Sequence, residues 1–205
     1  MAESIIYLAR HGMHDLLLPE QNRMAGSLPG VRLNPQGVAQ AERIASRLAA
    51  EPITWVASSP LERTRETAEI IARPHGCGVT VDERLLEWRS GPWEGMAITE
   101  IQQRYPTEWA LWRERPEQLH LAGAETVDQV AERMQAAYEA WAAHGGVGVL
   151  VSHQDPLSAL LCRLLDAPLN GMRVLEIPPG SLSVAREVAY GTVITGINLG
   201  ALTNA

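Results

Sequence analysis

Short apolar runs alternate along the chain with segments in which apolar residues recur every three or four positions. This alternation predicts the strands and helices of an α/β sheet. The apolar runs predict strands at 4–9, 53–57, 79–82, 147–151, 181–187 and 192–198. The helical patterns fall at about 35–50, 60–73, 95–104, 107–114, 125–143 and 156–166. We expect an α/β fold in a single three-layer domain over 1–205, with a mostly parallel central sheet of about six strands flanked by helices.

The segment 88–124 differs from the rest of this pattern. It holds four of the six tryptophans of the chain, Trp88, Trp93, Trp109 and Trp112, and two of the predicted helices. We expect a helical, lid-like excursion over the sheet. Tryptophans in such a segment serve core or lid packing more often than they form a stacking platform for a ligand.

Two predicted helices begin directly after strands. Ser59 is a good N-cap, Pro60 suits the first helical position, and Glu62 completes a capping box. After the strand at 147–151, Asp155 is likewise an N-cap candidate and Pro156 suits the first helical position. Both signals place the carboxyl end of a strand against the N-terminus of a helix. A third helix start is expected near Glu125 or Thr126.

Charge and basic-residue usage restrict the chemistry of the chain. The net charge of −7 offers no basic field to nucleic acid or to an anionic membrane. All 17 basic residues counted as Lys plus Arg are arginines. This excludes a Walker-type phosphate lysine and a Schiff-base lysine. Any anion site must therefore use guanidinium groups, which bind oxyanions in a planar, bidentate way.

Cysteine usage and the apolar runs bear on the compartment. Cys77 and Cys162 form no CxxC motif and no disulfide framework, which favours a reducing compartment. Cys162 lies in an apolar helical run and is expected in the core. No apolar run approaches a membrane span, and the first strand leaves no room for a signal peptide. We expect a cytoplasmic protein, and its oligomeric state is open.

Three predicted strands end in residues that suit one kind of ligand. Arg10 and His11 follow the first strand, the segment 58–63 with Arg63 follows the second, and His153 follows the strand at 147–151. Ligands of open α/β sheets bind at the carboxyl ends of the strands. Two guanidinium groups, a histidine and helix N-termini suit a dianionic tetrahedral group such as phosphate. One histidine can then act as nucleophile while the other donates to the phosphoryl oxygens.

A phosphoryl transfer from an ester also needs an acid for the leaving alkoxide. Glu87 follows the strand at 79–82 and lies in a segment rich in tryptophan and glycine. Apolar surroundings raise the pKa of a carboxyl toward the range that a general acid needs. Glu87 is therefore the candidate acid.

Four motifs together resemble those of the histidine phosphatase superfamily, in the branch that contains phosphoglycerate mutases and many small-molecule phosphatases. They are "LARHG" at 8–12, "SSPLERTRETA" at 58–68, "LLEWRSGPWEG" at 85–95 and "VSH" at 151–153. Their order along the chain matches the family, and the resemblance covers nearly the whole length. Segment 26–37, with "SHQDP" at 152–156, also resembles an uncharacterised phosphomutase-like subgroup.

The resemblance implies a role for each matching residue. His11 would be the nucleophile that becomes phosphohistidine. Arg10, Arg63 and His153 would clamp the phosphoryl group, and Glu87 would protonate the leaving group and then activate water. No metal and no other cofactor are implied, and the partner would be a phosphorylated small-molecule substrate. Each lost clamp donor would cost roughly 3–4 kcal/mol of transition-state stabilisation.

Several positions depart from the family pattern. His14 occupies the place of the usual serine or threonine, and Gln154 follows the late histidine where glycine is common. We place both among the candidate substrate contacts, although Gln154 also fits a surface loop. Asn22 is a weaker candidate for a missing asparagine, and Asp155 is interpreted as a helix cap rather than an acid. The His11–His14 spacing lacks a third ligand, so no metal is expected.

Three functions stay open at this point. The favoured hypothesis is a metal-independent phosphatase that hydrolyses a phosphomonoester. Phosphoglycerate mutases, which are isomerases, typically have tyrosine three residues after the acidic glutamate, where this chain has Ser90. A mutase-type phosphotransfer is therefore the first alternative, and a non-catalytic phosphate-binding relative is the second. The leaving group is not readable from the sequence.

Overall fold

The central sheet has six strands, in the order β3-β2-β4-β1-β5-β6. The computed structural model describes residues 4–199. The strands are β1 (Ser4–Arg10), β2 (Ile53–Ser58), β3 (Val79–Val81), β4 (Gly146–Ser152), β5 (Leu182–Val188) and β6 (Gly191–Leu199). Each boundary lies within one residue of the range predicted from the apolar runs. The structure therefore confirms the predicted α/β fold class with a six-stranded sheet.

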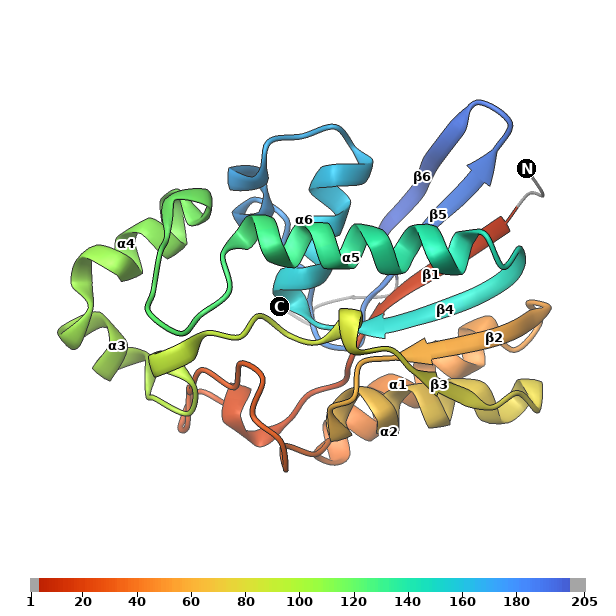
Figure 1. Cartoon of the computed structure of the whole chain (residues 1–205). Coiled ribbons are helices and arrows are strands. Elements are labelled where there is room, and N and C mark those ends of the chain that lie inside the picture. Colours follow the sequence, from red (N-terminus) through yellow and green to blue (C-terminus); the bar gives the residue numbers. More distant parts are fainter. Residues whose placement is uncertain (1–3, 200–205) are drawn as a thin grey trace.

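Strand directions follow from the lengths of the connections. β1, β2, β3 and β4 are parallel, because a helix or a long segment joins each of them to the next. β5 pairs antiparallel with β1, and β6 pairs antiparallel with β5 across a two-residue turn. The sheet is therefore mostly parallel, with an antiparallel hairpin at one edge (Figure 1).

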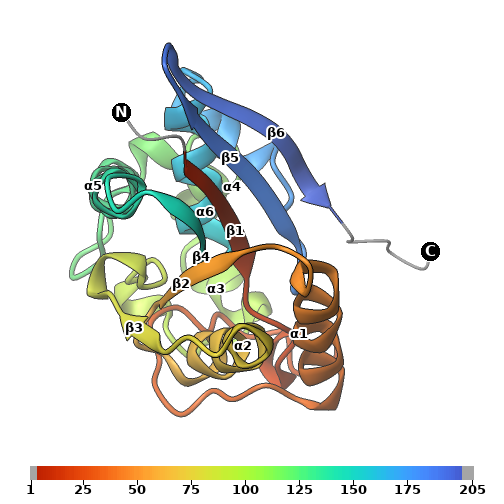
Figure 2. The ribbon, with the colours of Figure 1, turned by 90° about the vertical axis from the view of Figure 1, so that its right-hand side faces the viewer.

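Helices cover both faces of the sheet. They are α1 (Pro35–Leu48), α2 (Glu62–Ala72), α3 (Ile98–Arg104), α4 (Pro106–Glu114), α5 (Val127–Ala142) and α6 (Gln154–Leu164). Figure 2 shows α1 and α2 on one face and α5 and α6 on the other. None of the helices within 4–199 has the length and apolar character needed to cross a membrane.

Each face of the sheet has its own apolar core. Ile44 and Ile71 of α1 and α2 pack with Val149 of β4 on one face. Met134 of α5 and Leu160 of α6 pack with other residues of β1 and β4 on the opposite face. The central strands are buried on both faces, which explains why their sequences are nearly all apolar.

Two of the predicted helix starts are wrong. α2 begins at Glu62 with Leu61 as N-cap, and no side chain caps it. The Ser59 hydroxyl instead lies 2.8 Å from Nε2 of His153, because these two residues end neighbouring strands. α6 begins at Gln154, so Asp155 is already in its first turn and pairs with Arg173. A local cap pattern could not anticipate these long-range partners.

The third helix start is confirmed. Thr126 is the N-cap of α5, and its hydroxyl accepts from the Gln129 backbone N–H at 3.3 Å. The Gln129 side chain accepts in return from the Thr126 N–H at 2.9 Å, which completes a capping box.

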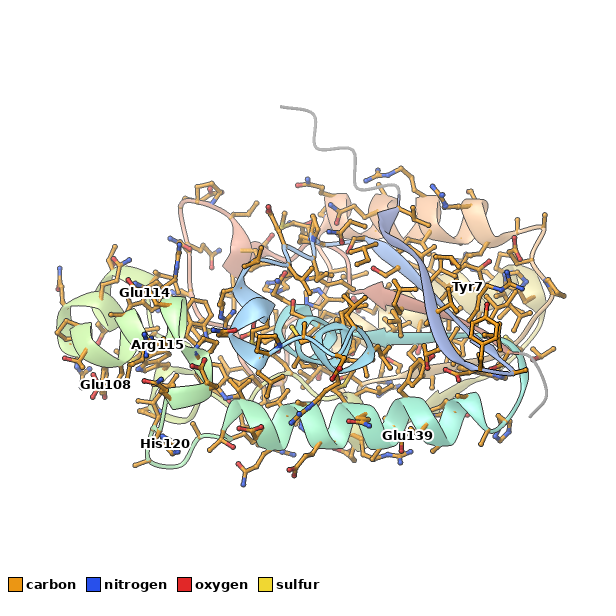
Figure 3. All side chains as sticks on the ribbon, turned by 90° about the horizontal axis from the view of Figure 1, so that it is seen from above. Tyr7, Glu108, Glu114, Arg115, His120 and Glu139 are labelled. Carbon is orange, nitrogen blue, oxygen red and sulfur yellow. The ribbon has the colours of Figure 1, made fainter. Side chains whose placement is uncertain are left out.

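The excursion at 88–124 packs beside the sheet around tryptophan. Trp88 and Trp93 are buried in a third core with Val130 of α5 and Cys162 of α6. Trp109 and Trp112 pack against this core, and their rings stack at 4.9 Å. Figure 3 shows Glu108, Glu114 and Arg115 of this excursion far from Tyr7 of β1, at the opposite end of the molecule. The expected packing roles of the tryptophans and of Cys162 are confirmed.

Two glycines allow the segment after β1 to touch the start of α1. A Cβ on Gly12 would lie 2.3 Å from the Gly37 carbonyl oxygen, and a Cβ on Gly37 would lie 2.1 Å from the Met13 carbonyl oxygen. The two backbones are thus in direct contact. This contact holds the residues that follow Arg10.

We expect Gly37→Ala to lower the free energy of unfolding by about 1–3 kcal/mol, because the added methyl group overpacks this contact. Denaturant unfolding would measure the change. Gly78→Ala is the matched control, since a Cβ there meets no atom within 4 Å. Equal unfolding midpoints for the two variants would contradict the prediction.

Candidate active site

The three strand ends that the sequence singled out meet at one edge of the sheet. Arg10 is the last residue of β1, and His153 lies between β4 and α6. Arg10 pairs with Ser152 across β1 and β4, and Ser58 pairs with Val151 across β2 and β4. The carboxyl ends of β2 and β4 point toward the side on which α3 and α4 lie (Figure 1).

His11 presents a neutral imidazole to this edge. The side chain is 1% exposed, and its Nδ1 lies 2.7 Å from the Gly12 carbonyl oxygen. Because a carbonyl only accepts, Nδ1 carries the proton and Nε2 keeps its lone pair. Burial, with the charges of Arg63 and Arg10, holds the pKa of His11 well below its usual value. His11 is therefore a neutral imidazole whose Nε2 has a free lone pair.

The ring of His153 lies beside that of His11. Its Nε2 lies 2.8 Å from the Ser59 hydroxyl, while its buried Nδ1 has no hydrogen-bond partner within residues 4–199. The two rings meet edge to face at 5.0 Å. Burial and the charge of Arg63 lower the pKa of His153 as well. The sequence missed the contribution of Ser59, since this residue resembled a helix cap.

Two guanidinium groups complete the positively charged side of the site. Arg63 is 1% exposed and donates through Nη2 to the Gly26 carbonyl at 2.7 Å and through Nη1 to the Leu28 carbonyl at 3.3 Å. Burial lowers the pKa of Arg63 to about 10, so it stays charged at neutral pH. The Nε atoms of Arg10 and Arg63 are both buried without a partner in the described part of the chain. Buried, unpaired donors of this kind need an anionic or polar ligand.

The Glu87 carboxyl has a raised pKa. Burial, and next the negative charge of Asp155, raise the pKa of Glu87 to about 7. Its Oε1 accepts a hydrogen bond from the Trp88 backbone N–H at 2.8 Å. Asp155 is itself held by Arg173 at 2.7 Å. At neutral pH a large share of Glu87 is protonated and can donate a proton.

His14 lies inside the same site. Its ring stacks on that of His11 at 5.3 Å and 28°. The side chain is 1% exposed, and its Nδ1 is buried with no partner among the residues described. Burial, then the charges of Arg63 and Arg10, lower the pKa of His14 to about 3. His14 is thus a neutral ring that covers one face of His11.

Gln154 lines the site but has no free hydrogen-bonding position. Its Oε1 accepts from Arg10 Nη1 at 2.8 Å and from the Ile177 backbone N–H at 3.1 Å. Its Nε2 donates to the Leu175 carbonyl at 3.1 Å and to the Ser158 hydroxyl at 3.3 Å. A side-chain amide has two acceptor and two donor positions, and all four are used here. The geometry places Gln154 behind Arg10 rather than against a phosphate.

A cavity of about 600 Å³ is lined by His11, Arg63 and Glu87, whereas His153 is not among its lining residues. Trp112 of the excursion and Met172 and Leu175, which follow α6, also line it. Asn22 also lines the cavity. Met172 and Leu175 could not be predicted as lining residues, because they lie outside every motif.

No metal site accompanies this cavity. Within residues 4–199, no three His, Cys, Asp or Glu side chains gather as a metal would require. The rings of His11 and His14 are stacked, and the guanidinium cations of Arg63 and Arg10 act on both. The donor set therefore suits an anion rather than a cation.

The chain is similar to known phosphatases and mutases over most of its length. The family model of the histidine phosphatase superfamily (branch 1) matches residues 6–200. Phosphoserine phosphatase 1 of Hydrogenobacter thermophilus is 30% identical over 172 residues, which are 82% of this chain and 80% of that protein. The probable phosphoglycerate mutase GpmB of Photorhabdus laumondii is 33% identical over 184 residues, 87% of this chain and 82% of that protein. The chain spans about half the length of three mycobacterial relatives that it also matches.

Solved structures give the same result. YhfR of Bacillus stearothermophilus has a TM-score of 0.89 at 25% identity, with 94% of this chain and 95% of that one covered. Mycobacterial glucosyl-3-phosphoglycerate phosphatase has a TM-score of 0.83 at 26% identity, with 96% and 99% covered. The chain therefore belongs to branch 1 of the histidine phosphatase superfamily.

Proposed function

We propose that this protein is a metal-independent phosphatase that hydrolyses a phosphomonoester of a small molecule through a phosphohistidine on His11. The main observation behind this proposal is the neutral His11 ring. Its Nδ1 donates a hydrogen bond to the Gly12 carbonyl, which leaves Nε2 free to attack phosphorus. Unpartnered guanidinium nitrogens of Arg10 and Arg63 lie at the same site and match the oxygens of a phosphoryl group. The names of two similar proteins, phosphoserine phosphatase and glucosyl-3-phosphoglycerate phosphatase, support hydrolysis.

The first chemical step transfers the phosphoryl group to His11. Nε2 attacks phosphorus as the bond to the ester oxygen breaks, and the leaving oxygen takes the proton of Glu87. The ring becomes positively charged, and the Nδ1–H bond to Gly12 stabilises that charge. Arg10, Arg63 and His153 hold the phosphoryl oxygens throughout.

The second step returns the enzyme to its starting state. Ionised Glu87 removes a proton from water, whose oxygen attacks phosphorus as the bond to Nε2 breaks. Inorganic phosphate leaves, His11 regains its lone pair, and Glu87 is again protonated. A carboxyl with a pKa of about 7 can serve in both directions near neutral pH.

A mutase-type phosphotransfer is the second candidate, favoured by the similarity to GpmB. The two activities differ in what happens to the phosphohistidine. Release of inorganic phosphate from a panel of phosphomonoesters in the presence of EDTA would support the phosphatase. Isomerised phosphoglycerate without phosphate release would support the mutase, and vanadate binding without turnover would support a non-catalytic relative.

The excursion at 88–124 is the proposed lid of this site. Trp112 and Arg113 of α4 line the cavity, together with Leu175 and Glu176 from another part of the chain. We propose that these residues select the leaving group of the substrate. His14, stacked on His11, is proposed to contact the substrate close to the phosphoryl group.

Gln154 is proposed to act on phosphate through Arg10. We expect Gln154→Leu to weaken the binding of orthovanadate, a phosphate analogue, by about tenfold or more, because it removes a hydrogen bond to a charged group and leaves the Arg10 side chain bonded only to the Ile177 carbonyl among the described residues. Isothermal titration of vanadate would measure this loss. Gln135→Leu is the matched control, since Gln135 bonds only the exposed Glu139. Unchanged vanadate affinity in Gln154→Leu would contradict this role.

A further inference from the structure

The position of Glu87 depends on its main chain. Its carboxyl accepts one hydrogen bond from the described residues, and that bond comes from the neighbouring Trp88 N–H. Glu87 follows a short 3-10 turn, Glu83–Leu85, and lies outside the strands and helices. A general acid must reach the leaving oxygen to within hydrogen-bond distance. Something else in the fold must therefore hold this segment.

Arg133 of α5 holds it from one side. Its Nη1 donates to the carbonyls of Arg84 at 2.8 Å and Leu86 at 2.6 Å, and its Nη2 donates to the carbonyl of Glu87 at 3.1 Å. Its Nε and Nη2 also bond the two carboxylate oxygens of Glu125 at 2.8 and 3.0 Å. A guanidinium has five N–H groups, and all five are used here. Three of them bind the backbone that carries Glu87.

Glu125 holds the segment from the other side. Its Oε2 accepts from the Arg89 backbone N–H at 3.1 Å, and its own N–H donates to the Arg89 carbonyl at 2.9 Å. Its carbonyl accepts from the Trp88 indole at 2.7 Å. The side chains of Arg133 and Glu125 are each only 14% exposed. The pair thus bonds the backbone on both flanks of Glu87 and is largely shielded from water.

We propose that Arg133 and Glu125 form the positioning pair for the general acid Glu87, an inference that rests on the proposed function. Neither side chain lines the cavity, and both instead bond the backbone at and beside Glu87. Their hydrogen bonds act through the 84–89 backbone on the position of the Glu87 carboxyl. The phosphate clamp of Arg10, Arg63 and His153 is held by other contacts. Loss of the pair should therefore impair protonation of the leaving group and spare phosphate binding.

Two aryl phosphates of nearly the same shape separate these effects. Phenyl phosphate has a basic leaving group that needs an acid, whereas p-nitrophenyl phosphate has an acidic one that needs it far less. We expect Arg133→Met to lower kcat/KM for phenyl phosphate about tenfold or more beyond its effect on p-nitrophenyl phosphate. Glu87→Gln should also lower kcat/KM more for phenyl phosphate than for p-nitrophenyl phosphate, and the difference should be larger than in Arg133→Met. Vanadate affinity should stay within about twofold of the wild-type value.

A double variant tests whether the two residues act through one another. In the Glu87→Gln background, Arg133→Met should cause little further loss on phenyl phosphate, because the acid is already absent. Arg163→Met, which removes an exposed ion pair with Asp128, is the control and should leave both activities unchanged. Glu125→Gln and Arg133→Lys should show a smaller selectivity, and they provide the test if Arg133→Met does not fold.

Each other outcome has a distinct meaning. Equal losses on both aryl phosphates, additive losses in the double variant, or weakened vanadate binding would overturn the positioning role. Equal losses would indicate a general effect on the fold, which thermal unfolding would detect separately. A wild-type protein that binds vanadate but hydrolyses neither ester would instead overturn the proposed function.

Discussion

His11→Ala should abolish hydrolysis of p-nitrophenyl phosphate, with a loss of at least about 10³-fold, and no acid-labile phosphoenzyme should form. His11 is the site histidine with both its proton position and its free nitrogen determined by the structure. Its Nδ1 donates to the Gly12 carbonyl, so Nε2 alone is left to attack. Burial and two neighbouring guanidinium groups keep the ring neutral, and therefore nucleophilic, at neutral pH.

His14 makes this prediction sharper, because it is a second neutral histidine stacked on the first. If His14 were the phosphate acceptor, His11→Ala would still form an acid-labile phosphoenzyme, and His14→Ala would not. We expect the reverse. Rapid quench of the protein with radiolabelled substrate, followed by acid and base treatment, distinguishes phosphohistidine from a phosphoester. Phosphoenzyme in His11→Ala would contradict the proposed mechanism.

Glu87→Gln should lower kcat/KM for phenyl phosphate by roughly 10²–10⁴-fold and remove one limb of its pH profile. The carboxyl donates a proton in the first step, so its protonated form is the active one. With a pKa of about 7, that form is abundant below neutrality and is lost as the pH rises. The wild-type kcat/KM should therefore fall above about pH 7. The amide of glutamine does not titrate, so the variant should lack this decline.

Asp155→Asn tests the cause of the raised pKa. The negative charge of Asp155 is the second contribution to the pKa of Glu87, after burial. Asp155→Asn removes this negative charge and leaves the Arg173 cation without its ion-pair partner. The lost negative charge and the unpaired cation both stabilise ionised Glu87. The declining limb should move to lower pH while the acid itself is retained. If the decline of kcat/KM at high pH stays in place in Asp155→Asn, or persists in Glu87→Gln, a group other than Glu87 causes it.

Much of the fold and of the site could be predicted from the sequence because both depend on local patterns. The apolar runs locate all six strands, and most clearly β1, β2 and β4, which are apolar because both of their faces are covered. Arg10, His11 and His153 follow such runs directly. Because parallel strands end at the same edge, their side chains were expected to meet. The structure places the His153 ring against that of His11, and Arg10, His11 and Glu87 line one cavity.

Other features depend on partners far away in the chain. Ser59 and Asp155 have the local signature of helix caps, yet their partners are His153 and Arg173. Gln154 looked like a substrate contact or a loop residue, but four protein groups occupy its amide. Hydrogen-bonding capacity is a property of one residue, whereas the groups that use it are chosen by tertiary packing.

By itself, the sequence determined the strand positions, the order of the motifs and the kinds of side chain available for phosphate chemistry. Only the tertiary structure decided how those side chains are tuned and held. The pKa of Glu87 depends on burial and on a carboxylate 68 positions away, and its placement depends on Arg133 and Glu125. Electrostatic fields and hydrogen-bond geometry depend on distances in space, which a linear pattern does not contain.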